Sequence, residues 1–334
     1  MKTRTLGADL TVSAVGLGCM GFSHAYGAPT ERSEAVRAIR AALDLGYTLF
    51  DTAETYGTAA DPHENEKLVG EALREVRGAV QIATKFGIRF DETGAAVNKP
   101  LVPDSRPETI RASVEGSLRR LGTDHIDLYF QHRMDPKVAP ATVAQVMADL
   151  IREGKITHWG ISEATGDYLR RAHAVCPVTA VQNRYSMMAR WHEALFPVLE
   201  ELHVGFVAFS PMANGLLTGA YGAASQFDPR LDYRSAMPQF GPEAAEQNRA
   251  LLTLLRELAA EKHATPAQIS LAWMMCKKPW IVPIPGSRRP ERMQENAGAA
   301  EICLTPADVQ ALDRALEALP MSAVFGGSAV TGGK

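Results

Sequence analysis

The sequence predicts a closed (β/α)8 TIM barrel, an α/β fold in which eight parallel strands alternate with helices. Eight short apolar runs typical of buried strands alternate with helical patterns, and the composition does not change abruptly along the chain. An open doubly wound sheet usually ends near about six strands, so eight alternations favour a closed barrel. A barrel of this kind uses 334 residues as one unit, and we therefore expect a single domain over residues 1–334.

The strand candidates are short runs rich in apolar and β-branched residues. They lie at 15–18, 47–51, 80–84, 126–131, 157–162, 180–183, 205–210 and 280–285. The helical patterns between them lie near 31–45, 64–76, 107–121, 140–153, 166–174, 192–202 and 266–277. In the first helix Val36, Ile39 and Leu43 share one face, and Gly46 ends the pattern.

Several segments are additions to a minimal barrel. Residues 3–6 and 10–13 flank a Gly-Ala-Asp turn and predict an N-terminal β-hairpin. Residues 218–242 lack periodicity and predict a long loop over the mouth of the barrel. Residues 243–263 and 305–319 predict two extra helices. We expect the glycine-rich tail, from about 321 to 334, to be mobile.

Composition and charge exclude several classes of function. A net charge of -3 and a pI near 6.3 do not show the excess of positive charge that is typical of nucleic-acid-binding proteins. No run approaches the ~18 apolar residues of a membrane span, and no signal peptide is evident. The four cysteines lack the spacing of a zinc site or a disulfide framework. We expect a cytoplasmic protein without a metal; its oligomeric state is left open.

The segment GLGCMG at 16–21 matches the G-x-G-x-x-G pattern of a dinucleotide-binding turn. That motif should open a helix directly after its strand, but here an irregular segment follows and the next helix begins only near Thr30. The context therefore disfavours a Rossmann interpretation. We expect the glycines to let the first strand–helix loop approach a ligand closely.

Polar residues at the ends of the predicted strands indicate an enzyme. Asp51, Lys85 and His132 each follow an apolar run, and Tyr56 lies five residues after Asp51. The carboxyl ends of barrel strands meet on one rim, where active sites lie. A phenol with a pKa near ~10 donates a proton poorly at neutral pH unless a nearby cation favours its anion. Lys85, held by Asp51, can supply that cation, and His132 can orient an incoming oxygen.

Other interpretations of the same residues stay open at this point. Asp51 with Lys85 is also compatible with a buried structural ion pair, and His132 with a core histidine. A barrel aldolase would use Lys85 to form a Schiff base with its substrate. A glycosidase would use paired carboxylates such as Asp51 and Glu163.

A second motif follows the eighth strand candidate. Residues 284–296 read IPGSRRPERMQEN, in which a serine and three arginines stand at the start of a helix. The amino terminus of a helix after the last barrel strand is a common phosphate site, and arginine donors suit a phosphate monoester. A solvated basic helix start is the alternative.

These motifs together resemble the aldo-keto reductase family. DTAETYG at 51–57, TK at 84–85, QHR at 131–133, WGIS at 159–162, VQN at 181–183, FSP at 209–211 and IPGS at 284–287 follow that family's pattern in order, over essentially the whole chain. The resemblance implies an NADP(H)-dependent oxidoreductase that reduces small aldehydes or ketones to alcohols. Tyr56 would be the proton donor, tuned by Lys85 and Asp51, and His132 would position the carbonyl.

The resemblance also implies a set of cofactor-binding residues. Ser162 and Gln182 would hold the nicotinamide amide, and Phe209 would stack on its ring. The remaining implied contacts are Met20, Asp51, Ser210, Pro211, Met212, Asn214, Leu216 and Gly286, with Ser287, Arg288 and Arg292 at the 2′-phosphate and Glu295 and Asn296 at the adenine. Met20, Phe22, Tyr56, Phe86 and the loop 218–242 would build the substrate pocket.

Some positions depart from the family pattern. Glu163 stands where many members have Asn, and Phe209 replaces a frequent Tyr. Gly286 and Arg289 stand where other members carry Lys and Thr, which leaves the division of phosphate contacts among the arginines open. The stretch 206–219, with YSMM at 185–188, resembles the bacterial and fungal members of broad substrate range more than the steroid dehydrogenases. Some members of the family bind NADPH as a non-catalytic sensing subunit, and that alternative also remains.

Overall fold

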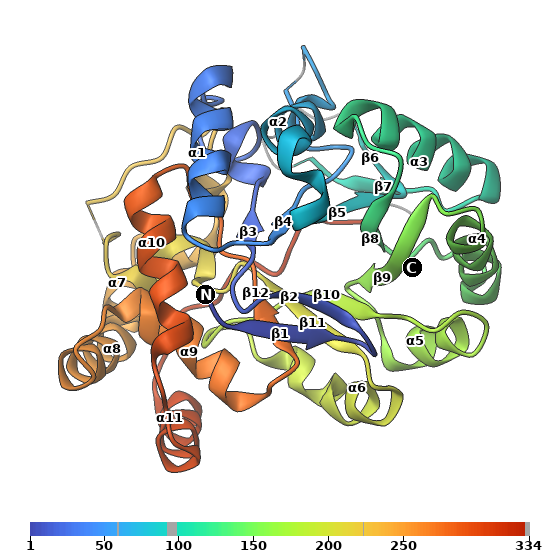
Figure 1. Cartoon of the computed structure of the whole chain (residues 1–334). Helices are drawn as coiled ribbons and strands as arrows, with labels where there is room; N and C mark the ends of the chain where they lie inside the picture. Colours follow the sequence, from blue (N-terminus) through green and yellow to red (C-terminus); the bar gives the residue numbers. More distant parts are fainter. Residues whose placement is uncertain (59, 92–98, 223, 331–334) are drawn as a thin grey trace.

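A computed structural model describes residues 1–58, 60–91, 99–222 and 224–330 and shows a parallel eight-stranded sheet (Figure 1). The strands stand in the order β12-β11-β10-β9-β8-β5-β4-β3, and each neighbouring pair is parallel. Their bounds are β3 (Leu17–Gly18), β4 (Leu49–Asp51), β5 (Gln81–Phe86), β8 (Ile126–Gln131), β9 (Ile156–Ser162), β10 (Ala180–Arg184), β11 (Gly205–Phe209) and β12 (Ile281–Pro283). The predicted (β/α)8 barrel is confirmed.

Two glycines allow the first and last strands to close the barrel. The backbone N–H of Gly16 donates to the carbonyl of Pro283 at 2.9 Å, and a parallel bridge joins Gly18 to Gly286. A Cβ atom on Gly18 would lie 2.8 Å from the carbonyl oxygen of Ile284, which is too close for any other residue. The motif at 16–21 is therefore not a Rossmann turn. Gly16 and Gly18 form the closing seam, and Gly18 and Gly21 also line the cavity described below.

Helices surround the strands on the outside of the barrel (Figure 1). The predicted helices correspond to α1 (Arg32–Asp44), α2 (Glu64–Leu73), α3 (Pro107–Leu121), α4 (Pro140–Arg152), α5 (Gly166–His173), α6 (Phe196–Leu202) and α9 (Pro266–Lys277). A large apolar core lies between these helices and the sheet, with Trp159 and Trp273 among its fully buried side chains. This core and the helix ring hold the strand ends that build the site.

The N-terminal hairpin packs against the amino ends of the barrel strands. Strands β1 (Thr3–Leu6) and β2 (Leu10–Ser13) pair antiparallel as predicted. Leu6, Leu10 and Val12 pack with inward-facing residues of the strands, such as Phe130 and Val207, in a second apolar cluster. The hairpin supplies apolar side chains that close this interior cluster.

Of the two predicted extra helices, one forms as a single helix and the other is divided into two. The segment 305–319 forms one helix, α11 (Pro306–Ala318), whose capping box joins Thr305 and Asp308. The segment 243–263 forms two helices, α7 (Ala244–Gln247) and α8 (Arg249–Glu261). Asn248 stands between them, and its buried side-chain amide exchanges two hydrogen bonds of 2.9 Å with Ser322 in the C-terminal segment.

The structure adds short elements that the sequence did not predict. A hairpin of β6 (Ile88–Phe90) and β7 (Leu101–Pro103) stands after β5. The helix predicted to begin after β12 does form, as α10 (Pro290–Gly298). Short 3-10 helices are η1 (Met20–Phe22), η2 (Arg74–Ala79), η3 (Trp191–Leu195), η4 (Ala213–Thr218), η5 (Tyr233–Ala236), η6 (Pro238–Phe240) and η7 (Ala299–Glu301). The last four predicted tail residues, 331–334, lie outside the described residues.

The C-terminal segment makes specific contacts up to Ala329. The N–H of Phe325 donates to Gln239 at 2.9 Å, and the carbonyl of Ala329 accepts from the N–H of Leu101 at 2.7 Å. These bonds tie the segment to the mouth loop and to the β6–β7 hairpin. The predicted mobility of the tail stays a prediction. In the described ranges, no helix is both long enough and apolar enough to cross a bilayer.

We expect Leu6→Ala to lower the free energy of unfolding by about 2–5 kcal/mol, because it removes a fully buried side chain from the cluster inside the barrel. Thr5→Ala, at an exposed position of the same strand, serves as the matched control and should change stability by no more than about 0.5 kcal/mol. Urea unfolding followed by circular dichroism measures both. Equal stability of the two variants would show that the hairpin does not support the barrel.

Candidate active site

A cavity of about 510 Å³ lies over the carboxyl ends of the strands, within the usual size range of small-molecule sites. Its walls come from the ends of β4, β8, β9, β10 and β11, from α10, and from the mouth loop and C-terminal segment. The predicted catalytic residues Asp51, Tyr56 and His132 line it. Lys85 lies directly behind them and is 1% exposed. Four residues from three strands or strand–helix loops thus converge on one end of the cavity.

Asp51 and Lys85 form a buried ion pair at the centre of this cluster. The ammonium of Lys85 donates to Oδ1 of Asp51 at 2.6 Å and to the carbonyl oxygen of Thr52 at 2.7 Å. The second carboxylate oxygen, Oδ2, accepts from the amide of Gln182 at 2.7 Å. Every oxygen of the carboxylate therefore has a donor, and the pair is fixed from both sides.

Tyr56 stands next to this ion pair. The nitrogen of Lys85 lies 5.0 Å from the centre of the Tyr56 ring, and the His132 ring meets the Tyr56 ring edge to face at 5.7 Å. Burial raises the pKa of Tyr56, and Lys85 acts in the opposite direction as a charge and as a hydrogen-bond donor. The ammonium has the predicted effect on the phenol, but burial outweighs it, so Tyr56 is held in its protonated form.

The neighbouring groups have defined charge states. Burial opposes the charge on Lys85, but Asp51 and Tyr56 outweigh it, and the pKa of Lys85 lies above its ordinary value. Burial, together with the charges of Arg133 and Lys85, holds the pKa of His132 well below its usual value. His132 is therefore neutral, and its buried Nδ1 atom has no hydrogen-bond partner. Because His132 also lines the cavity, its neutral imidazole can contact an incoming oxygen.

The other end of the cavity is suited to phosphate groups. After β11 the backbone at Ser210, Ala213 and Asn214 takes positive φ values of 50°, 49° and 60°, which folds the loop tightly beside the cavity. The amino terminus of α10 faces the same region, and its N-cap position has no side-chain cap. Helix N-terminal N–H groups without a cap favour anions.

The arginines of this end differ in how they are used. Arg288 donates to the carbonyl oxygens of Gly21, Ala28 and Tyr26 at 2.5, 2.8 and 2.9 Å, so it anchors the loop after β3. Arg292 is half exposed and contacts Glu295 at 2.5 Å. Arg292 is accordingly more available to a phosphate than Arg288.

Nearly all the predicted cofactor-binding residues line this one cavity: Met20, Asp51, Ser162, Gln182, Phe209, Ser210, Pro211, Met212, Asn214, Gly286, Ser287, Arg288, Arg292, Glu295 and Asn296. Leu216 is the exception within the described chain. Its side chain is 4% exposed and packs in the outer core instead of lining the cavity.

The prediction that Phe22 and Phe86 build the substrate pocket is wrong. Phe22 and Phe86 are 1% and 0% exposed and belong to the outer core. Phe86 follows Lys85 directly in β5, and successive side chains of a strand face opposite sides, so its ring points toward Tyr129 and the helices. Met20 and Tyr56 do line the cavity, together with Tyr233, Arg234 and Met237 of the predicted mouth loop.

Sequence reasoning missed several residues of the cavity. His24 contacts the hydroxyl of Tyr233 at 3.2 Å and stacks at 6.0 Å from the Tyr56 ring. Arg184 lies at the end of β10, where the strand-end rule that found His132 would also have found it. Phe325 comes from the C-terminal segment, and no sequence signal places it here.

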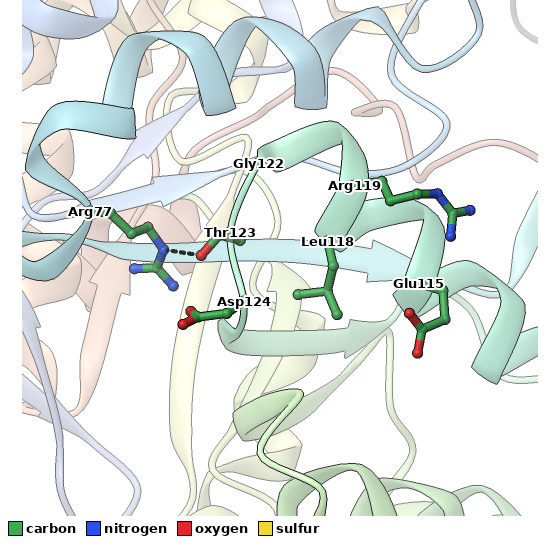
Figure 2. A pocket seen from close by; sticks show the side chains of 7 residues that line it. All are labelled: Arg77, Glu115, Leu118, Arg119, Gly122, Thr123 and Asp124. Carbon is green, nitrogen blue, oxygen red and sulfur yellow. Dashed lines mark hydrogen bonds between the residues drawn. The ribbon is translucent and has the colours of Figure 1, made fainter.

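A second pocket lies at the opposite rim and lacks the features of a site (Figure 2). It is a shallow depression formed by η2, α3 and the loop before β8. Figure 2 shows Arg77 bonded to Thr123 at 2.8 Å, with Glu115, Arg119 and Asp124 around the opening. Barrel active sites lie at the carboxyl ends of strands, and this rim carries the amino ends. In the described ranges, no group of three or more His, Cys, Asp or Glu side chains is arranged to hold a metal.

Comparisons with known proteins agree with this architecture. A model of the Aldo/keto reductase family matches residues 14–317. A probable aldo-keto reductase 1 from Glycine max is 37% identical over 319 residues, which is 95% of this chain and 88% of that protein.

Solved structures are also similar. The glycerol dehydrogenase AKR11B4 from Gluconobacter oxydans superposes with a TM-score of 0.83 at 29% identity, over 97% of this chain and 98% of that one. The aldo-keto reductase AKR11C1 from Bacillus halodurans, in its holo form, gives 0.75 at 27% identity, with 97% and 98% covered. Since the family model spans most of the chain and the Glycine max relative exceeds 30% identity, this chain belongs to the aldo/keto reductase family of oxidoreductases.

Proposed function

We propose that this protein reduces aldehydes or ketones to alcohols with NADPH, and that Tyr56 donates the proton to the carbonyl oxygen. The observation that supports this most directly is the convergence of Asp51, Lys85, Tyr56 and His132 at one end of a single cavity. The other end offers an uncapped helix terminus and arginines, as a phosphorylated dinucleotide requires.

The residues of the cavity fit a nicotinamide dinucleotide phosphate. The flat ring of Phe209 lines the cavity between the catalytic cluster and the tight loop 210–215. Ser162 and Gln182 stand at neighbouring strand ends, and Ser162 is fixed by a 2.8 Å bond to the carbonyl of Gln182. When bound, the cofactor supplies a hydride to the carbonyl carbon. Arg292 would meet the 2′-phosphate, with Ser287 beside it.

The catalytic residues divide the remaining work. Tyr56, kept protonated by burial, gives its proton to the carbonyl oxygen as negative charge develops there. The ammonium of Lys85 stabilises the phenolate that remains, and Asp51 holds that ammonium in place. His132, neutral and in the wall of the cavity, contacts the same oxygen and orients it.

The alternative enzyme classes fit the geometry less well. A Schiff base needs an uncharged amine, but the ammonium of Lys85 is bound by Asp51 and Thr52 and its pKa is raised. A glycosidase needs two free carboxyl groups, but Asp51 is paired with Lys85 and Glu163 lies 3.4 Å from His192. A non-catalytic sensing subunit would bind NADPH without turnover.

The experiment that tests the proposal is a panel of carbonyl compounds assayed with NADPH and with NADH. The decrease in reduced-nicotinamide absorbance reports turnover, and fluorescence titration reports binding. Turnover with NADPH supports a reductase. Tight NADPH binding with no turnover on any carbonyl compound would favour the sensing subunit.

We expect Tyr56→Phe to lower kcat by roughly 100-fold or more, because it removes the proton donor and keeps the ring. The Kd for NADPH, measured by fluorescence titration, should stay near the wild-type value. Unchanged turnover would remove Tyr56 from the mechanism.

Lys85→Met should abolish reduction and also destabilise the fold by about 3–5 kcal/mol, because Asp51 loses its partner in a buried site. The double variant Asp51→Asn with Lys85→Met removes both charges and should recover most of the stability but not the turnover. Urea unfolding and steady-state kinetics separate the two effects. Normal rates in either variant would contradict the role of the ammonium.

Arg292→Ala should raise the Kd for NADPH by about tenfold or more and change the Kd for NADH little, because only NADPH has a 2′-phosphate. NADH serves as the matched control ligand in the same titration. An equal loss for both cofactors would place the 2′-phosphate at another residue.

A further inference from the structure

Six arginines line the cavity, and four of them are bound by carboxylates or by backbone carbonyl groups. Three of them contact carboxylates: Arg234 contacts Asp232 at 2.6 Å, Arg289 contacts Glu291 at 2.8 Å, and Arg292 contacts Glu295 at 2.5 Å. The fourth, Arg288, donates to three backbone carbonyls of the loop after β3. Arg133 and Arg184 remain. In the described part of the chain, no carboxylate oxygen forms an ion pair within 4.0 Å of either guanidinium group.

Arg184 is the least satisfied of the six. Its side chain is buried, and its Nε atom has no hydrogen-bond partner. A single long bond of 3.4 Å joins its guanidinium to Asn214. The faces of the guanidinium lie over two aromatic rings, at 4.9 Å from Phe209 and 5.2 Å from Phe325. Because the rings occupy the faces, further polar contacts must come from the edge.

Arg133 adds a second positive charge nearby. It donates to the carbonyl of His132 at 2.6 Å and to the hydroxyl of Ser162 at 3.2 Å, and neither acceptor is charged. Glu163, an acid close to both arginines, is engaged elsewhere. Its oxygens contact the backbone N–H of Arg184 at 3.0 Å and the ring of His192 at 3.4 Å. Glu163 therefore offsets only part of the charge of the two guanidinium groups.

A buried guanidinium without an ionic partner is costly, and an anion at its free edge would offset that cost. We propose that Arg184, assisted by the charge of Arg133, binds the carboxylate of an anionic carbonyl substrate. Arginine suits this role because its donors match a carboxylate in pairs. This inference rests on the proposed function, since it names the class of carbonyl compound that the same cavity reduces.

The position of Arg184 constrains the shape of that substrate. Strand β10, which ends with Arg184, and strand β4, which leads to Tyr56, are separated by three strands in either direction around the barrel. The two residues therefore stand on opposite sides of the mouth. A substrate that reaches both has its carboxylate several bonds away from its carbonyl group, unlike a 2-oxo acid.

The nucleotide is a less suitable source of the anion. The groups suited to its phosphates lie on the tight loop after β11 and at the start of α10. Arg133 and Arg184 instead follow β8 and β10, on either side of Ser162, and Arg133 stands next to His132 in the chain. Arg133 thus stands beside His132. Arg184 also bonds Asn214 of the loop after β11 at 3.4 Å, so NADPH binding by Arg184→Met must be measured separately from turnover of the acid.

The test compares 4-carboxybenzaldehyde with its neutral methyl ester, methyl 4-formylbenzoate, as substrates of the full chain with NADPH. The wild-type protein should show a kcat/KM at least about tenfold higher for the acid, the factor expected for a hydrogen bond to a charged group. Arg184→Met should lower this acid-to-ester ratio at least tenfold, and Arg184→Lys should keep part of it. Arg249→Met, at an exposed position far along the chain in α8, is the matched control and should keep the wild-type ratio.

Each outcome has a distinct meaning. If neither aldehyde is reduced, the proposed function fails. If both are reduced with similar kcat/KM, or if Arg184→Met preserves the ratio, the anion subsite is overturned. It is also overturned if Arg184→Met weakens NADPH binding by the same factor as it lowers turnover of the acid, since the arginine then binds the nucleotide.

If Arg184→Met does not fold, an inhibition experiment on the wild-type protein tests the proposal instead. Benzoate should inhibit reduction of the ester at least tenfold more strongly than benzamide, and equal inhibition overturns the proposal.

Discussion

The buried ion pair of Asp51 and Lys85 is the interaction on which the site depends. Two opposite charges are stable here because every acceptor and donor around them is used: Gln182 holds the second carboxylate oxygen, and Thr52 accepts from the ammonium. These partners come from β4, β5 and β10, so three strands must stand in register before the pair can form. The barrel thus places a fixed positive charge beside Tyr56 that a mobile surface lysine could not provide.

The two ends of the cavity carry different kinds of residues, and the topology of the barrel sets which strands supply each end. The end with Asp51, Lys85 and His132 lies over β4, β5 and β8, and the anion-suited end lies over β11 and α10. The seam between β3 and β12 brings the loop after β3 against the loop after β12, and Arg288 fastens the two by three bonds to carbonyl oxygens. The mouth loop and C-terminal segment then cover the cavity, with Gln239 and Phe325 joined by a hydrogen bond. Segments from both ends of the chain therefore complete one site.

Much of the site could be predicted because strand-end position and chemistry agree. Asp51, Lys85 and His132 each end an apolar run, and parallel strands bring such positions together. The errors arise where side-chain direction or competing contacts decide. Phe86 faces the helices because its neighbour Lys85 faces inward. Arg288 lines the cavity and stays a predicted 2′-phosphate contact, and its donors also bond backbone carbonyls of the loop after β3. Asn248 stands between α7 and α8, where the pattern predicts one helix, and its side-chain amide binds Ser322.

The sequence by itself determined the fold class and a set of candidate site residues, because these follow from periodicity and from polar residues at strand ends. Only the tertiary structure decided that Tyr56 is kept protonated by burial, that Arg288 is committed, and that Arg184 is buried without an ionic partner. The physical reason is the same in each case. The charge state and availability of a side chain depend on desolvation and on partners distant in the chain, and no local pattern of residues records either.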